Sequence, residues 1–338
     1  MYQYPRGRRW TAGALFAGLM AAFAMPAGAA SDYPQKPISL VVPFAAGGSL
    51  DATARIIGDK ADDILGQQII IINRPGAGSS VGARSVASAD PDGYTMLIAS
   101  GSAYGYMHML IPGYDLTLAD FEPIAVVAVN PSVIVSSASL GVDSLEGLVD
   151  YVAKHPGKVS FCSTGVGGLN HLQLEMFKEV VKADTGKDFA VEHIPYNGLA
   201  PAVVGLVGKE VQACTLPYTA MVKERNGTDL NILAVQSPSR IQSMPDVPTT
   251  GEAGFKEMDS NDAFVNITAP KGTPPEVIAK LEAAIQQAME DPAVLEKLHA
   301  LDIQTVFMGS KETGDWLKED VAKYEKLIKG AGLAVEKK

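Results

Sequence analysis

Apolar and polar positions along this chain follow two different periods, and together they predict strands and helices in alternation. Short apolar runs are typical of buried strands, whereas apolar stripes that recur every three or four residues are typical of helices packed on one face. The runs predict strands over 38–43, 69–73, 94–99, 121–129, 132–136, 158–163, 190–195, 211–216, 232–236 and 303–307. The stripes predict helices over 51–65, 81–89, 145–155, 169–183, 200–207, 274–290, 292–301 and 311–329.

This alternation favours an α/β fold of two lobes, each a mainly parallel sheet with helices on both faces. A strand, a glycine loop and a helix follow one another at 38–65 and again at 158–183. Asn130-Pro131 marks a crossing between lobes, so we expect 31–130 plus 247–338 to form lobe 1 and 131–246 to form lobe 2. Ligands then sit where strands end, in a cleft between the lobes.

The first thirty residues read as a signal peptide rather than as part of the fold. Arg6, Arg8 and Arg9 precede an apolar run over 12–25, and Ala27-Gly28-Ala29 fits a cleavage site, with cutting after Ala29 or Ala30. The run is shorter than the roughly 20 residues that span a bilayer. An uncleaved anchor is the alternative, and the choice between general and twin-arginine export stays open.

The net charge of the chain limits the kinds of partner that it can bind. The leader holds three of the 28 basic residues and none of the 38 acidic ones, which leaves residues 31–338 with a net charge of −13. Such a chain does not bind nucleic acid or anionic lipid through bulk charge. Any anion site must therefore be local and built from backbone donors.

The loop after the first strand is the leading candidate for such a site. Gly47 and Gly48 allow a ligand to approach the backbone, and Ser49 or Asp51 can cap the helix that follows. The free N–H groups and the dipole of that helix favour an anion such as a carboxylate. An ordinary β–α turn is the alternative. The candidate ligand residues here are Phe44, Ala45, Ala46, Gly47, Gly48, Ser49 and Asp51.

A second loop repeats this logic before the helix over 169–183. The candidates are Thr164 as a hydroxyl donor, the glycines Gly165, Gly167 and Gly168, and Asn170 or His171 as side-chain donors. For His171, packing in the first helical turn is an equal alternative. Two such loops in matching places suggest a ligand held at both ends.

Further residues at strand ends can line the same cleft. Tyr196 and Asn197 precede a helix whose first turn contains Pro201, although Asn-Gly is also ordinary turn chemistry. Ser100 and Ser102 follow another strand.

The two cysteines, Cys162 and Cys214, lie late in strand-like runs. If those strands are neighbours in an oxidising compartment, a disulfide can form, and two buried thiols are the alternative.

Enzymatic chemistry finds little support. Gly78-Ser79-Ser80-Val81-Gly82 spells a nucleophile elbow around Ser80, but Arg74-Pro75-Gly76-Ala77 separates it from the strand. The sequence carries no HExxH, no CxxC and no Walker A motif, so we expect no metal and no cofactor.

Taken together, the motifs resemble the Bug-type periplasmic solute receptors of tripartite tricarboxylate transporters. The matching segments run in order from about residue 33 to residue 333: Tyr33-Pro34-x-Lys36-Pro37-Ile38, Val42-Pro43-Phe44-x-x-Gly47-Gly48-x-x-Asp51, Asn73-Arg74-Pro75-Gly76-Ala77-Gly78, Pro91-Asp92-Gly93-Tyr94-Thr95, the loop ending in His171-Leu172, Tyr196-x-Gly198-x-x-Pro201-Ala202, Pro248-Thr249-x-x-Glu252-Ala253-Gly254 and Ala269-Pro270-x-Gly272-Thr273-Pro274.

The resemblance implies a type II periplasmic-binding-protein-like fold and a monomeric, non-enzymatic receptor in the periplasm. Its cargo is a small organic carboxylate (a di- or tricarboxylate, an aromatic acid or an acidic amino acid), which lobe closure captures for an integral membrane transporter. Phe44, Tyr196 and Phe264 would shape the pocket. The chain departs from the family in Ala45-Ala46, where a proline pair is commoner, in its cysteines, and in Phe264, where many members have tryptophan. Signalling to a sensor kinase and an exported hydrolase using Ser80 are the alternative functions.

Overall fold

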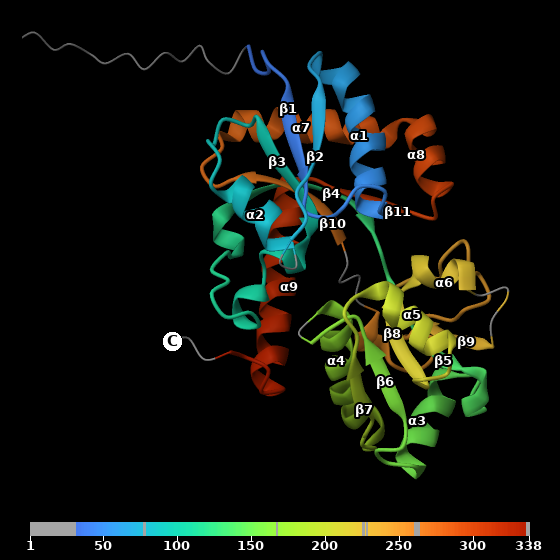
Figure 1. Ribbon diagram of the computed structural model, residues 1–338. Coiled ribbons are helices and arrows are strands. Elements are labelled where there is room, and N and C mark those ends of the chain that lie inside the picture. Colours follow the sequence, from blue (N-terminus) through green and yellow to red (C-terminus); the bar gives the residue numbers. More distant parts are fainter. Residues whose placement is uncertain are drawn as a thin grey trace, which may run out of the picture. The chain divides into compact units, whose positions relative to one another are not determined.

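The computed structural model describes residues 32–335 apart from 77–78, 167, 225–226, 228 and 260–263. The predicted signal peptide and its cleavage site lie outside these residues. Figure 1 shows two sheets, each with its own helices; the first combines strands from both ends of the chain, and the second uses only its middle. Both belong to the unit Pro34–Lys338.

The first sheet, in lobe 1, has six strands in the order β11-β4-β10-β3-β1-β2. The bounds of its strands are β1 Ile38–Val42, β2 Ile69–Asn73, β3 Thr95–Ser100, β4 Phe121–Val129, β10 Phe264–Pro270 and β11 Gln304–Met308. Strand β1 pairs in parallel with β2 and β3, whereas β10 and β11 pair antiparallel.

The second sheet, in lobe 2, has five strands in the order β7-β6-β8-β5-β9. Its strands are β5 Ser132–Ser137, β6 Ser160–Ser163, β7 Glu192–Pro195, β8 Ala213–Pro217 and β9 Leu230–Val235. Strand β6 lies parallel to β7 and β8, while β5 runs antiparallel to β8 and β9.

Both sheets are mixed, but most strands of each sheet run in one direction, as expected from the sequence. Strands β10 and β11 run against the other four strands of the first sheet, and β5 runs against the other four strands of the second. The chain passes directly from β4 of the first sheet into β5 of the second, with Asn130-Pro131 between the two strands.

Helices flank both sheets (Figure 1). In lobe 1 these are α1 Ser49–Leu65, α2 Ser80–Ala87, α7 Pro275–Glu290, α8 Pro292–His299 and α9 Ser310–Gly330. In lobe 2 they are α3 Leu145–Lys154, α4 Leu169–Thr185, α5 Leu199–Val207 and α6 Tyr218–Glu224. Helix α1 packs on α7 and α8, and α9 contacts both β4 and α4. Among the described residues, no helix combines the length and apolar character needed to cross a membrane.

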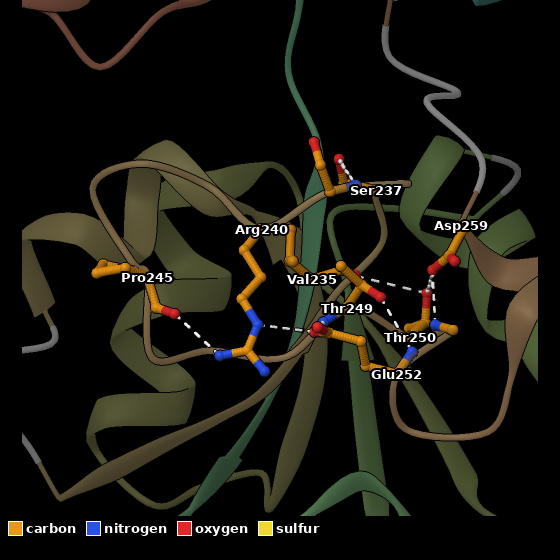
Figure 2. A network of polar contacts seen from close by, with 10 residues as sticks. Val235, Ser237, Arg240, Pro245, Thr249, Thr250, Glu252 and Asp259 are labelled. Carbon is orange, nitrogen blue, oxygen red and sulfur yellow. Dashed lines mark hydrogen bonds and ion pairs between the residues drawn. The ribbon is translucent and has the colours of Figure 1, made fainter.

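A polar network holds the segment that returns from β9 to lobe 1 (Figure 2). The Arg240 guanidinium contacts a Glu252 carboxylate oxygen at 2.8 Å and donates to the Pro245 carbonyl at 3.0 Å. The Thr250 hydroxyl donates to Asp259 at 2.8 Å.

Sheet membership changes between β4 and β5 and again between β9 and β10. The division at residues 130 and 247 stays a prediction.

Two elements escaped the sequence pattern, namely β10 and α6. Strand β10 carries Asn266 and Thr268, which read as polar positions yet are fully buried in the middle of the first sheet. The Tyr104 hydroxyl donates a hydrogen bond to Asn266 Oδ1, which offsets the cost of burying that amide.

Candidate ligand-binding site

The first glycine loop joins β1 to α1 and leaves the helix end open. Gly47 adopts a φ of 90°, which an L-residue rarely takes, and Gly48 is the extended N-cap of α1 without a side-chain cap. Ser49 is the first helical residue and Asp51 lies within the first turn, so the prediction that either side chain caps this helix is wrong. The helical ladder begins with the bond from Ala52 N–H to the Gly48 carbonyl, 2.9 Å. The preceding N–H groups therefore point out of the helix end.

Asp51 stabilises this loop from within. Its buried carboxylate (4% exposed) accepts hydrogen bonds from Gly47 N–H at 2.9 Å, from Arg55 at 3.0 and 3.1 Å, and from Asn73 Nδ2 at 3.0 Å. The Arg55 guanidinium, helped by the two neutral donors, lowers the pKa of Asp51 to about 2 against the opposing effect of burial. The Asp51 side chain therefore positions the loop, and its role as a ligand contact stays a prediction.

The remaining candidates of this loop are accessible. Ala45, Ala46, Gly47, Gly48 and Ser49 are exposed, and the Phe44 side chain is 47% exposed beside them. The Asn73 amide also donates to the Phe44 carbonyl at 3.1 Å, which fixes the start of the loop.

The second glycine loop joins β6 to α4 with the same arrangement. Gly165 has a φ of 147°, and Gly168 is the extended N-cap of α4, again without a side-chain cap. The Thr164 carbonyl accepts from Gly198 N–H at 3.1 Å, and its hydroxyl donates to Asn170 Oδ1 at 3.0 Å. Gly167 lies outside the described residues.

Asn170 and His171 face into lobe 2. The Asn170 amide nitrogen donates to Ser132 Oγ at 3.3 Å and to Gln173 Oε1 at 3.1 Å, so both of its protons are used within the protein. The buried His171 ring stacks on His193, with centroids 4.1 Å apart. For His171 this is the packing alternative that the sequence left open, and a role of either side chain as a ligand donor stays a prediction.

Tyr196 and Asn197 have different surroundings. The Tyr196 hydroxyl donates to Glu210 at 3.2 Å, and its ring lies where a side chain on Gly205 of α5 would be. Tyr196 thus covers α5, and its reach into the cleft stays a prediction. Asn197 is exposed at the turn.

The serine pair and Phe264 complete the predicted set. Ser100 Oγ and Ser102 Oγ form a 2.7 Å hydrogen bond at the end of β3, and both residues are half-buried. Phe264 is buried at the start of β10, where it packs on Trp316 of α9 with ring centroids 4.3 Å apart. Phe264 also lines a pocket together with Val129, Pro131 and Ser237.

Both glycine loops adjoin the segment that crosses between the sheets. Ser49 and Leu50 of α1 line a small cavity together with Asn130 and Tyr218. From the second loop, Asn170 bonds to Ser132, two residues beyond Asn130. Tyr218 was not among the predicted site residues, because α6 was not predicted and the tyrosine follows an ordinary strand end.

The cysteines form a disulfide, so the alternative of two buried free thiols does not hold. Cys162 of β6 and Cys214 of β8 are register partners in the parallel pair, with Cα atoms 4.5 Å apart, and both are fully buried.

Ser80 does not occupy a nucleophile elbow. Strand β2 ends at Asn73, whereas Ser80 is the first residue of α2 and is nearly buried. An elbow requires the strand to run directly into the serine. Within the described ranges, no group of three His, Cys, Asp or Glu side chains is placed to hold a metal ion.

Comparisons with known proteins agree with this geometry. Residues 53–333 match a family described as the tripartite tricarboxylate transporter family receptor. The chain is 33% identical to Protein BugT of Bordetella pertussis, over 90% of this chain and 91% of that protein. The solved structure of the periplasmic binding protein BugD is 30% identical, with a TM-score of 0.70, over 90% of this chain and all of that one.

A third relative was solved with a ligand. This Rhodopseudomonas palustris protein, with adipate, is 28% identical to the chain, with a TM-score of 0.72, over 90% of this chain and 99% of that one. These likenesses confirm the predicted two-lobed fold of the periplasmic binding proteins.

Proposed function

Because this chain belongs to the tripartite tricarboxylate transporter receptor family, we propose that it binds a small organic carboxylate between its two glycine loops and delivers it to a membrane transporter. A receptor of this kind makes and breaks no bond. Its work is recognition of the ligand and presentation of the bound state.

One observation carries the proposal: both lobes offer the same kind of helix end. Gly48 begins α1 and Gly168 begins α4, each in an extended conformation and each without a side-chain cap. Both helices have 17 residues, so each presents unpaired N–H groups and the positive end of a substantial dipole. A dicarboxylate suits two such ends, one carboxylate at each.

The charges around the first loop favour recognition by backbone rather than by a cation. Arg55 of α1 is engaged with Asp51 through the Nε and Nη2 edge of its guanidinium. The carboxylate would therefore bind through N–H groups and hydroxyls, and each charge-assisted bond contributes about 1.5–3 kcal/mol.

Closure of the lobes would let the transporter recognise the ligand-bound receptor. The chain changes sheet at 130–131 and again between β9 and β10, and both loops adjoin the first of these crossings. A ligand held by both loops stabilises the closed state by its differential affinity for that state. The transporter would then recognise the closed receptor.

The cargo we favour is a linear dicarboxylate. The relative solved with adipate carries such a ligand, and the exposed Phe44 beside the first loop offers apolar contact to a carbon chain. Tricarboxylates, aromatic acids and acidic amino acids belong to the same test.

Two observations support a periplasmic location. The leader predicts export, and a buried disulfide requires an oxidising compartment such as the bacterial periplasm.

A thermal-shift screen of the chain from residue 31 onward tests the proposal. The panel contains adipate, malate, citrate, benzoate, glutamate and, as uncharged controls, adipamide and glucose. Selective stabilisation by one carboxylate class is expected, because a ligand that binds only the folded state adds about 2.7 kcal/mol at a hundred times its Kd. Stabilisation by the uncharged solutes alone would contradict the proposal.

A further inference from the structure

The last two residues of β6 are tied to both neighbouring strands, directly before the second glycine loop. Cys162 is bonded covalently to Cys214 of β8. Ser163, the next residue, forms a 2.8 Å hydrogen bond between its Oγ and Nε2 of His193 on β7. No residue of this group was a candidate for ligand contact.

Ser163 connects that anchor to the loop backbone. Its fully buried hydroxyl oxygen accepts a hydrogen bond from Gly165 N–H at 3.3 Å. Gly165 stands at a φ of 147°, so the loop reverses direction at the residue that Ser163 holds. The orientation of the loop therefore depends on where the Ser163 hydroxyl is fixed.

His193 is a neutral hydrogen-bond partner of Ser163, whose hydroxyl also lies 3.3 Å from the Gly165 carbonyl oxygen. Burial, aided by the nearby His171 and Lys178 and opposed by Glu175, lowers the pKa of His193 to about 4. Its imidazole is thus neutral at neutral pH, and a neutral imidazole has one accepting nitrogen. The parallel stack on His171, tilted by only 4°, keeps the ring in place against the first turn of α4.

We propose that His193 and Ser163 are positioning residues for the lobe 2 half of the carboxylate site, acting on Gly165 and the loop that follows it. The inference rests on the proposed function, because it assigns these residues to the same site. They touch no ligand. They hold the loop in its binding conformation before the ligand arrives, which lowers the ordering cost of binding.

Two substitutions at position 193 separate positioning from packing. His193→Phe keeps an aromatic ring for the stack but removes the acceptor, whereas His193→Gln supplies an acceptor oxygen without a ring. Positioning predicts that His193→Phe and Ser163→Ala each weaken carboxylate binding about tenfold, and that His193→Gln recovers part of the loss. A packing role predicts the reverse order at position 193.

The matched control is His155→Phe. His155 also lies in lobe 2, stacks on an aromatic ring (Tyr151, centroids 4.4 Å apart) and donates from Nδ1 to a backbone carbonyl at 2.9 Å, but it follows α3. The Kd of His155→Phe for the carboxylate should equal that of the wild type.

Calorimetric titration with the carboxylate that stabilises the wild type most gives the readout, and circular dichroism and Tm report folding. Unchanged Kd in both Ser163→Ala and His193→Phe, with a wild type that binds, would overturn the inference and leave the proposed function standing. A wild type that binds no carboxylate would overturn the proposed function itself.

Discussion

At the scale of single residues, the polar side chains nearest the two loops serve the protein rather than a ligand. Asp51 accepts four hydrogen bonds from its own loop and from its neighbours, and Asn170 gives both amide protons to lobe 2. The sequence could identify these positions as candidates, because short polar residues after a glycine loop can cap a helix or bind a ligand. It could not show which way they point, since that depends on Arg55, Asn73 and Ser132, which lie on other turns and strands.

The open space at Gly48 allows a direct test of the first loop. A Cβ added there meets only the Ala45 carbonyl, at 4.0 Å, and Gly48 has an ordinary negative φ of −80°. Gly48→Val should therefore keep the far-UV circular dichroism and Tm of the wild type while it blocks the helix end. We expect carboxylate binding at least about a hundredfold weaker, from two lost charge-assisted bonds.

Gly227→Val is the control for this variant, because Gly227 also has open space around its Cβ position. It should bind as the wild type does. Full affinity in Gly48→Val would mean that the anion is held elsewhere.

Asp51 also predicts a pH dependence of stability. Its pKa is lowered from 3.8 to about 2 in the folded state, so its contribution is complete above pH 4 and is lost as the pH falls from about 4 to about 2. Asp51→Asn should lower the free energy of unfolding by roughly 1–2 kcal/mol at pH 7, a discounted value because Arg55 is half-exposed.

Urea unfolding at pH 7 and pH 3 measures this difference, with the exposed Asp143→Asn as control. The gap between wild type and Asp51→Asn should narrow at pH 3. A gap that widens on acidification would refute the assigned pKa.

At the scale of elements, the helices and most strands follow from the sequence, but the reversed direction of β5, β10 and β11 does not. Alternating apolar runs indicated β1–β3 and β6–β8, where parallel βαβ units dominate. The pattern missed β10, since Asn266 and Thr268 interrupt its apolar character, and both are buried only because β10 lies between β3 and β4. Strand order is a property of the assembled sheet, and no local pattern encodes it.

The stabilising effect of the disulfide can be measured in solution by its effect on the Tm. Both sulfurs are fully buried, so dithiothreitol without denaturant should leave the Tm unchanged during a short incubation. Protein that is unfolded, reduced and refolded should lose about 3–4 kcal/mol for a closed loop spanning a 52-residue separation, a fall in Tm on the order of 5–10 °C.

A Cys162→Ala/Cys214→Ala double variant should show the same lower Tm and no response to reductant. Equal Tm values for oxidised and reduced protein would contradict a stabilising role of the disulfide.

At the scale of the whole molecule, two separate helix ends adjoin one crossing segment, and this is the arrangement that a two-ended ligand requires. The first loop reaches it through the cavity shared by Ser49, Asn130 and Tyr218, and the second through the bond from Asn170 to Ser132. The glycine loops could be predicted from their spacing, whereas Tyr218 and Asn130 emerge only when α6 and the crossing are placed together.

Calorimetric titration with adipate, its half-amide and adipamide tests the central claim most directly, because the three differ only in the number of carboxylates. If each helix end holds one carboxylate, the diacid should bind most tightly, the half-amide at least about tenfold more weakly, and the diamide not measurably. Equal affinity for all three, or binding of the diamide alone, would contradict carboxylate recognition by the two glycine loops.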